Sequence, residues 1–182
     1  VVIACGDNGH AAVATVTAVS ITVYYQPLSS TVLVAGVAGS RLDVIATDGT
    51  VAATTATASD ERQSYVAFGS PSASATYIAN RGVTMRKLVG TTFSQPAGMP
   101  KAKWVGLQTP DNRLVAANIA VIPTGAGSTA STSLVHLADA GAPETWGANN
   151  YVYLTPGDNE DIKGIATWRD QTFIFKSSRF FV

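Results

Sequence analysis

Short runs of β-branched and aromatic residues dominate this sequence and leave little room for helices. Val, Ile, Thr, Tyr and Phe recur in runs of four to seven residues, and Gly, Asp, Asn, Pro and Ser separate these runs. This alternation predicts short strands joined by turns. The best helical candidate, "HAAVATVTAV" at residues 10–19, is so rich in Val and Thr that a strand is at least as favourable there. The sequence therefore predicts an all-β fold.

Four turn sequences divide the runs into hairpins. "TDGT" (residues 47–50) separates "RLDVIA" from "VAATTA", and "NRG" (80–82) separates "ATYIA" from "TMRKL". "VGT" (89–91) leads into "TTFSQ", and "PDNR" (110–113) separates "KWVGLQT" from "LVAANIAV". Gly accommodates the backbone of tight hairpin turns, while Pro, Asp and Asn favour turns through a fixed φ and local hydrogen bonds. Each pair of flanking runs is predicted to form an antiparallel hairpin.

The hairpins group into a weak internal repeat. One unit of four runs covers roughly residues 63–95, and a second covers roughly residues 103–155. A third unit begins at Ile162 and holds three runs, and two fainter units are expected within residues 1–62. Units of four antiparallel strands and about 35–50 residues are typical of propeller blades. The sequence therefore predicts a single β domain over residues 1–182, forming part or all of a β-propeller built of four-stranded meander blades.

A β-sandwich is the alternative architecture, because it uses the same short strands at a similar spacing. The recurrence of aromatic hairpins at blade-like intervals over residues 63–182 favours the propeller. In the last unit only three strands are expected, and an unpaired aromatic edge at residues 180–182 would invite aggregation. We therefore expect the fourth strand either from the apolar start "VVIAC" (residues 1–5) or from further chain beyond Val182.

Charged residues are scarce, at 13% of the 182 residues, and the 12 basic and 12 acidic side chains give a formal net charge of zero. A neutral chain offers no basic surface for nucleic-acid binding, so at most non-specific passage of DNA is expected. The low charge instead suits a subunit packed inside an assembly. Cys5 is the single cysteine, which excludes an intrachain disulfide. No apolar stretch reaches the roughly eighteen residues of a membrane span.

The order of the loops in the second half of the chain resembles that of a known family. A "DNRL" hairpin comes first, and the loop "DAGAPETWGANNYV" and the Gly/Asp turn "PGDNEDIKG" follow it. An apolar hairpin with "WRD" at its turn comes last, and "YVAFGSPSASATYIANRGVTMRKLVG" looks like a preceding blade. This order resembles tailed-bacteriophage virion proteins built on β-propellers, described as nozzle, hub or minor tail proteins. The resemblance covers roughly residues 64–182 and implies a non-enzymatic structural protein arranged in a ring at the tail axis.

One acidic turn and one histidine are the candidates for chemistry. "PGDNEDIKG" gathers Asp158, Glu160 and Asp161, whose oxygens could bind Ca²⁺, but their spacing is not that of an EF-hand loop and a solvated turn is favoured. His136 lies three residues from Asp139, and without a "GxSxG" motif a structural histidine is favoured over a catalytic triad. The two histidines are too few for a zinc cluster. We therefore predict no metal site and no cofactor.

Acidic residues are also missing where a propeller glycosidase would need them. Such enzymes place carboxylates on the inner strands of several blades, and the runs "ATYIA", "KWVGL", "GIATW" and "TFIFK" carry none. This absence disfavours a hydrolase, and we predict no catalytic residues.

The aromatic residues divide into core and loop candidates. Trp104 and Trp168 occupy matched positions before the turns "PDN" and "RDQ", which predicts packing between blades. Trp146 lies in the loop "APETWGANN", where it is either an interface anchor or a lid over its own blade. The predicted core residues are Trp104, Trp168, Phe173 and Phe175. The predicted interface residues are Pro143, Trp146, Asn149 and Asn150.

These expectations combine into one functional hypothesis and one alternative. The first is a structural component of a bacteriophage tail, part of an oligomeric ring or hub around the genome-delivery channel. Its partners would be copies of itself and neighbouring virion tail proteins, and it would reside in the virion after assembly in the host cytoplasm. The alternative is a carbohydrate- or receptor-binding propeller, which predicts exposed Trp or Tyr repeated in equivalent loops. Only Trp146 has that character.

Overall fold

The protein consists of β-strands and loops throughout the part of the chain that is described. The structure is a computed structural model that describes residues 22–25, 32–37, 41–46, 50–56, 63–70, 73–122 and 129–182. All regular elements in these ranges are strands, which confirms the predicted all-β class. Within these ranges no helix is long and apolar enough to cross a membrane.

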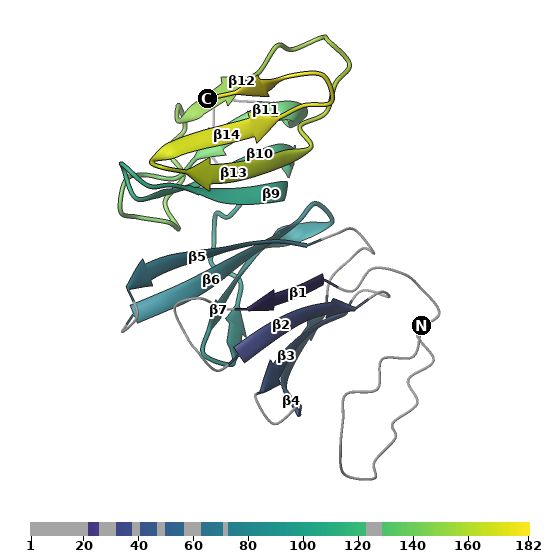
Figure 1. Ribbon diagram of the computed structural model, residues 1–182, viewed down its shortest axis with the longest axis vertical. Coiled ribbons are helices and arrows are strands. Elements are labelled where there is room, and N and C mark those ends of the chain that lie inside the picture. Colours follow the sequence, from purple (N-terminus) through teal and green to yellow (C-terminus); the bar gives the residue numbers. More distant parts are fainter. Residues whose placement is uncertain are drawn as a thin grey trace.

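The described residues form four antiparallel sheets, each from strands that follow one another along the chain (Figure 1). The first sheet contains β1 (Thr22–Tyr25), β2 (Val32–Val37), β3 (Arg41–Ala46) and β4 (Val51–Ala56). The second contains β5 (Ser64–Ser70), β6 (Ala73–Asn80), β7 (Val83–Val89) and β8 (Thr92–Ser94). The third contains β9 (Lys101–Gln108), β10 (Arg113–Val121), β11 (Ser131–Leu137) and β12 (Tyr151–Tyr153). The terminal sheet contains β13 (Gly164–Trp168), β14 (Gln171–Phe175) and β15 (Phe180–Phe181).

The predicted hairpins and units agree with these sheets. The second and third sheets correspond to the two clear units, and the terminal sheet has the three expected strands. In the turn between β13 and β14, Arg169 and Asp170 both have positive φ, 46° and 65°, which is the backbone of a two-residue hairpin turn. Before residue 63 the described residues form one four-stranded sheet, and the prediction of two fainter units extends over residues that lie outside the described ones. Residues 1–21, including the candidate strand "VVIAC", lie outside the described residues.

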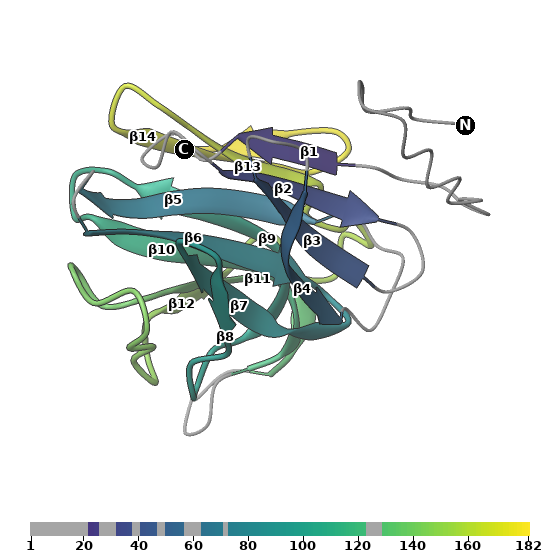
Figure 2. The same cartoon turned by 90° about the horizontal axis from the view of Figure 1, so that it is seen from below.

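The sheets stack in chain order, and the core lies between them (Figures 1 and 2). The largest buried cluster joins the second and third sheets, where Tyr77 and Met85 pack with Leu114 and Leu134. A smaller cluster joins the first and second sheets through Val44, Ile78 and Leu88. The third cluster joins the third and terminal sheets, with Val115, Ala117, Val135 and Ile162 at its centre and Ile165 and Ile174 against it. Burying the apolar faces of successive sheets is the main force that holds the stack together.

Strand β9 lies at the middle of the stack, with β5–β7 on one side and β13 and β14 on the other. The hydroxyl of Ser64 on β5 donates to the carbonyl of Val105 and accepts from its amide, over 3.2 and 3.1 Å. On the other side the hydroxyl of Thr167 on β13 donates to the carbonyl of Leu107. The first strands of three successive sheets are therefore neighbours. Among the described residues the four sheets follow one another without closing into a ring, so a closed propeller stays a prediction, and four sheets differ from the two of a β-sandwich.

Candidate functional site

The loop between β11 and β12 carries all four predicted interface residues. It covers residues 138–150 and is called here the Trp146 loop. The amide of Asp139 donates to the carbonyl of Thr145 over 2.7 Å, which folds the loop on itself. The amide of Leu137 donates to the carbonyl of Asn150 over 2.8 Å and closes the loop at its base. These hydrogen bonds within its own backbone therefore fold and close the loop.

Trp146 lies inside this chain as a lid over the gap between the second and third sheets. Its side chain is only 8% exposed and belongs to the main core cluster. The indole Nε1 donates to the sulfur of Met99 over 3.3 Å, and the ring meets that of His136 edge to face at 5.6 Å between centroids. Of the two predicted roles, this geometry is that of the lid. An exposed ring for carbohydrate or receptor binding is not available at Trp146.

The other three predicted interface residues differ in how far they face solvent. Asn150 is half-buried, and its Nδ2 donates to Oδ1 of Asp139 over 2.6 Å. Pro143 is half-buried, while Asn149 is exposed in the turn just before the base of the loop. Asn150 therefore supports the loop internally, and Asn149 is the member of the set that is free to meet a partner.

Glu144 extends from the Trp146 loop to the neighbouring sheet. Its Oε1 accepts from the ammonium of Lys87 over 2.5 Å and from the hydroxyl of Tyr77 over 2.9 Å. Lys87 is on β7 and Tyr77 is on β6, so this contact crosses from the third sheet to the second. The Lys87 and Glu144 side chains are 29% and 38% exposed, and an ion pair this accessible contributes at most about 1 kcal/mol. The ion pair matters mainly because it fixes the position of the loop against the second sheet.

The pKa directions at this contact follow from the same geometry. The hydrogen bond from Lys87 holds the pKa of the Glu144 carboxyl below its ordinary value. Burial raises the pKa of the Tyr77 hydroxyl well above its ordinary value, and the hydrogen bond and charge of Glu144 raise it further. At neutral pH Glu144 is therefore a carboxylate and Tyr77 a neutral phenol.

His136 lies in the core beneath the Trp146 loop, in the position of a structural histidine. It is fully buried, and its Nε2 lies 2.9 Å from the carbonyl of Gly147. A carbonyl can only accept, so Nε2 carries a proton. Burial lowers the pKa of His136, and the carbonyl partly opposes that shift. Asp139 accepts from Asn150 instead of from His136, so these residues do not form a triad.

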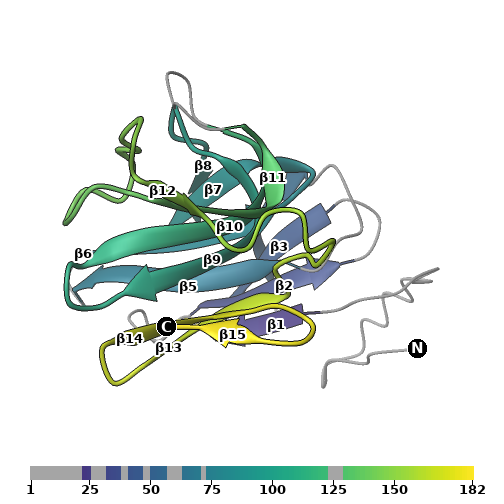
Figure 3. The same cartoon turned by 90° about the horizontal axis from the view of Figure 1, so that it is seen from above.

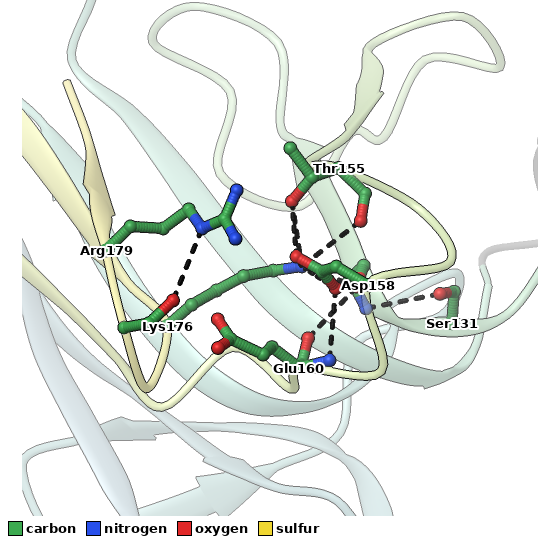
Figure 4. A network of polar contacts seen from close by, with 8 residues as sticks. Ser131, Thr155, Asp158, Glu160, Lys176 and Arg179 are labelled. Atoms are coloured by element: carbon green, nitrogen blue, oxygen red, sulfur yellow. Dashed lines mark hydrogen bonds and ion pairs between the residues drawn. The ribbon is translucent and has the colours of Figure 1, made fainter.

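Lys176 is the centre of a second contact between sheets, shown in Figure 4. It follows β14, and its side chain is fully buried. Its ammonium donates to Oδ1 and Oδ2 of Asp158 over 2.8 and 2.9 Å, to the hydroxyl of Ser133 over 3.0 Å and to that of Thr155 over 3.2 Å. Three partner groups match the three protons of an ammonium. The terminal sheet is thereby joined to β11 and to the loop after β12, residues 154–163, which we call the Asp158 loop.

Asp158 is held as firmly as the lysine that it binds. The hydroxyl of Thr155 donates to its Oδ2 over 2.6 Å, and the amide of Glu160 donates to its Oδ1 over 3.0 Å. The hydrogen bond from Lys176, followed by those from Thr155 and Glu160, holds the pKa of the Asp158 carboxyl far below its ordinary value. The carboxylate therefore stays charged throughout the pH range in which proteins function.

The carboxylates of the acidic turn face lysine ammonium groups at the positions where a calcium site would hold its metal ion. Asp158 faces the ammonium of Lys176, and Asp161 lies 3.8 Å from that of Lys163. In the described part of the chain no group of three or more His, Cys, Asp or Glu side chains is placed to hold a metal ion. The turn "PGDNEDIKG" thus acts as an inter-sheet connection, and sequence reasoning overlooked its lysine partner.

The four predicted core aromatics separate into covered and uncovered residues. Trp104 packs against the cluster between the third and terminal sheets, and its Nε1 donates to the carbonyl of Ile162 over 2.9 Å. Phe173 is half-buried. Trp168 and Phe175 are 60% and 39% exposed, so they do not pack in a core of this chain. The strands that carry Trp168 and Phe175 were predicted correctly. Both side chains lie on the face of the terminal sheet that points away from the third sheet.

The carbonyl of Ile162 is a further junction that the sequence did not reveal. Besides Trp104, it accepts from Nδ2 of Asn118 over 3.2 Å. Asn118 is buried at a bulge in β10 with φ of 58°, a conformation that Asn tolerates better than most residues. The "AAN" break in the apolar run of β10 was the available signal.

The Trp146 and Asp158 loops connect the third sheet to its two neighbouring sheets, and we call each of these two connections a clamp. One loop reaches back to the second sheet through Glu144, and the other reaches forward to the terminal sheet around Lys176. The polar side chains of the two loops form ion pairs and hydrogen bonds with other groups of the same chain. The arrangement can transmit force between sheets, and it presents no nucleophile or acid–base pair among the residues discussed.

Comparisons with protein-family models, curated proteins and solved structures gave no match to this chain.

Proposed function

We propose that this chain is a structural component of a bacteriophage tail and forms part of an oligomeric ring or hub around the genome-delivery channel. In this proposal the four sheets are propeller-type blades, and the loops on their edges meet copies of the chain and neighbouring tail proteins. The proposal is supported by the loop order of residues 64–182, which resembles that family, and by a stack of successive meanders, three of four strands and one of three.

The single observation that carries it is the use of polar side-chain contacts, one of them fully buried, to connect one sheet to the next. The fully buried Lys176 and the half-exposed Glu144 are both held by partners on neighbouring sheets. Well-satisfied polar networks of this kind rigidify a structure. A rigid stack whose polar groups face one another is suited to a mechanical role, in which faces and edges carry load between subunits.

Neutral charge fits the same role at a DNA channel. The formal net charge is zero, so the wall of a channel built from this chain would not attract the phosphate backbone strongly. DNA could then slide past without being retained. Passage of DNA in this proposal is non-specific and requires no base recognition.

The test is to locate the chain in purified particles from the source culture. Mass spectrometry should detect it among the virion proteins, and immunogold electron microscopy should place the label on the tail. The absence of the chain from every particle fraction would overturn the proposal. Turnover of a glycan or ester by a stable monomer would overturn it equally.

A further inference from the structure

His136 is a buried titratable group for which the proposed function has no use. Its side chain is fully buried on β11, beneath the Trp146 loop. Its Nε2 donates to the carbonyl of Gly147 over 2.9 Å. The imidazole also meets the rings of Trp146 and Tyr151 edge to face, at 5.6 and 6.3 Å between centroids. The loop therefore rests on the imidazole through both a hydrogen bond and a ring contact.

The other ring nitrogen of His136, Nδ1, has no acceptor to which it could donate a proton. Nδ1 is buried and has no hydrogen-bond partner among the described residues. Burial lowers the pKa of His136 below its ordinary value of 6.5, so at neutral pH the ring is neutral and its one proton is on Nε2. A second proton would place a positive charge and an unsatisfied donor in the core, and both are costly. That cost is removed when the ring reaches water.

The charged groups of the loop and of the second sheet are bonded elsewhere. On the Trp146 loop, Oδ1 of Asp139 accepts from an amide of the same loop over 2.6 Å. Glu144 accepts from Lys87 and Tyr77 of the second sheet, over 2.5 and 2.9 Å. Among the described residues neither carboxylate is bonded to the imidazole of His136. These groups therefore do not provide the acceptor that a protonated imidazole needs.

The strands beside His136 bring no further charge to it. Strands β11 and β12 contain no charged residue, and the β12 residue opposite His136 is Tyr151. In β10 the residue opposite is Ala116. The charged residue of β10, Arg113, pairs with Asp111 at the turn over 3.0 Å. The surroundings of His136 in the closed loop thus favour its neutral form.

One part of the Trp146 loop can separate from the core while the strands stay paired. The start of the loop is fixed by backbone hydrogen bonds, since the amides of Ala138 and Gly141 donate to carbonyls of the β9–β10 hairpin over 2.9 Å. Residues 144–147, which we call the lid segment, are attached through side chains. These attachments are the clamp through Glu144, the Trp146 bond to a sulfur and the His136 bond to a carbonyl. In Figure 3 the light green chain of the Trp146 loop lies beside the strands of the second sheet.

We propose that the lid segment is an acid-sensitive lid, which protonation of His136 releases from the core. In the open state both ring nitrogens donate to water, the indole of Trp146 and the sulfur of Met99 become accessible, and the clamp through Glu144 is lost. An apolar surface that is covered at neutral pH is thereby uncovered in acid. The inference goes beyond the proposed function and does not depend on it.

The direction of the pH dependence follows from the two states of the lid. The pKa of His136 lies below 6.5 in the closed state and returns to its ordinary value in the open state, so the open state takes up the proton first on acidification. The equilibrium constant for opening should be constant above pH 6.5. Below pH 6.5 it should rise by up to about tenfold per pH unit, until the pH reaches the closed-state pKa.

Hydrogen exchange of the full chain between about pH 8 and pH 5, the range in which histidine titrates, tests the lid. The reporters are the amides of Asp139 and Thr145, which donate to carbonyls within the loop over 2.7 and 3.0 Å. Their protection factors, corrected for the intrinsic pH dependence of exchange, should fall below pH 6.5 by up to about tenfold per pH unit. Amides in the β10–β11 ladder should stay better protected at every pH, because they exchange only through larger openings.

Two variants assign the pH dependence to His136. His136→Gln retains an N–H donor for the Gly147 carbonyl but does not titrate, so the pH dependence of Thr145 protection should disappear. Asp139→Asn is the matched control, since it removes a titratable group of the same loop, and it should retain the pH dependence. The other histidine, His10, lies outside the described residues, and His10→Gln should retain it as well.

Three results would each overturn the inference. One is a protection factor of Thr145 that does not change between about pH 8 and pH 5, and another is a change that persists in His136→Gln. The third is equal protection of the loop and strand amides in acid, which would mean that the loop opens only when the chain unfolds. If His136→Gln does not fold, the ¹⁵N shifts of the imidazole in the native chain decide. A pKa of 6.5 or above for His136 in the folded chain overturns the inference, and a lower one supports it.

Discussion

Replacing Gly106 by Ala tests whether β9 and β13 are in direct contact. Gly106 is buried on β9, and a Cβ built there would lie 2.5 Å from Cγ2 of Ile165 on β13. Ordinary contacts of a Cβ begin at 3.4 Å, so this atom falls about 0.9 Å short of the room that it needs. Ile165 is packed against the core cluster between the two sheets and cannot swing away freely. The substitution therefore has to push the terminal sheet from the third sheet.

The size of the effect follows from two opposing contributions. A methyl group forced into a packed core typically costs about 1–3 kcal/mol. The Gly106 backbone lies outside the left-handed region, so without the clash Ala would stabilise the chain by about 0.4–1 kcal/mol through the unfolded state. We expect a net loss of about 1–2 kcal/mol in the free energy of unfolding. Gly164→Ala is the matched control, since its nearest atom is 3.9 Å away, and it should be neutral or slightly stabilising.

Urea denaturation of a double-mutant cycle identifies the clash. Ile165→Ala removes the Cγ2 atom, so Gly106→Ala should cost little in that background and the coupling energy should be at least about 1 kcal/mol. If Gly106→Ala is neutral in the native sequence, the two strands are not in contact. If its cost is the same in both backgrounds, the strain has another source and the reasoning fails.

Three further predictions concern the lid, the buried lysine and the histidine. Trp146→Ala should lower the free energy of unfolding, measured by urea denaturation, by about 3–5 kcal/mol. The control Val152→Ala, at a 45% exposed position, should change it by less than about 0.5 kcal/mol. A small effect of Trp146→Ala would contradict its role as a core lid. Asp158→Asn should lower the melting temperature far more than Asp161→Asn, because it leaves the Lys176 ammonium buried without its counter-ion. Adding Lys176→Met to Asp158→Asn should restore part of the lost melting temperature. Equal effects of the two Asp→Asn changes would argue against the buried pair. Burial holds the pKa of His136 below its ordinary value of 6.5, so the unfolded chain takes up the proton first on acidification. The contribution of His136 to the free energy of unfolding should therefore be complete above pH 6.5 and decline below it. A decline of the same slope in His136→Gln would exclude His136 as its source.

The strands were predictable because their signal is local. The hairpin from β3 to β4 has the bounds of its two apolar runs, "RLDVIA" and "VAATTA", and the turn after Trp168 has the backbone that its sequence favours. Grouping into units also followed from the sequence, because each sheet contains only consecutive strands. What covers each face is not local. Trp104 and Trp168 occupy matched positions, yet one is covered by the loop that carries Ile162 and the other is 60% exposed.

The candidate site was less predictable because its contacts span long separations. Lys87 and Glu144 are 57 residues apart, and Trp146 reaches a sulfur 47 residues away. A loop tryptophan flanked by Pro and Asn gives no local sign of burial, so its two roles could not be separated. Lys176 ends the apolar run "TFIF", where a lysine is ordinarily solvated, and its burial depends on Asp158, 18 residues earlier. An isolated charge closing an apolar strand is the signal that could have identified it.

The two clamps determine how the sheets are aligned in a way that the apolar faces alone cannot. Hydrophobic burial is non-directional, so faces rich in Ala, Val and Leu would tolerate sliding of one sheet over another. Hydrogen bonds to Glu144 and Lys176 are satisfied only at one alignment, and misalignment would leave a buried ammonium without partners. In both clamps the lysine comes from a neighbouring sheet and the carboxylate from a loop of the third sheet. We infer that the loops of the third sheet set its alignment with the second and terminal sheets, because sliding of either neighbour would break the clamp on that side.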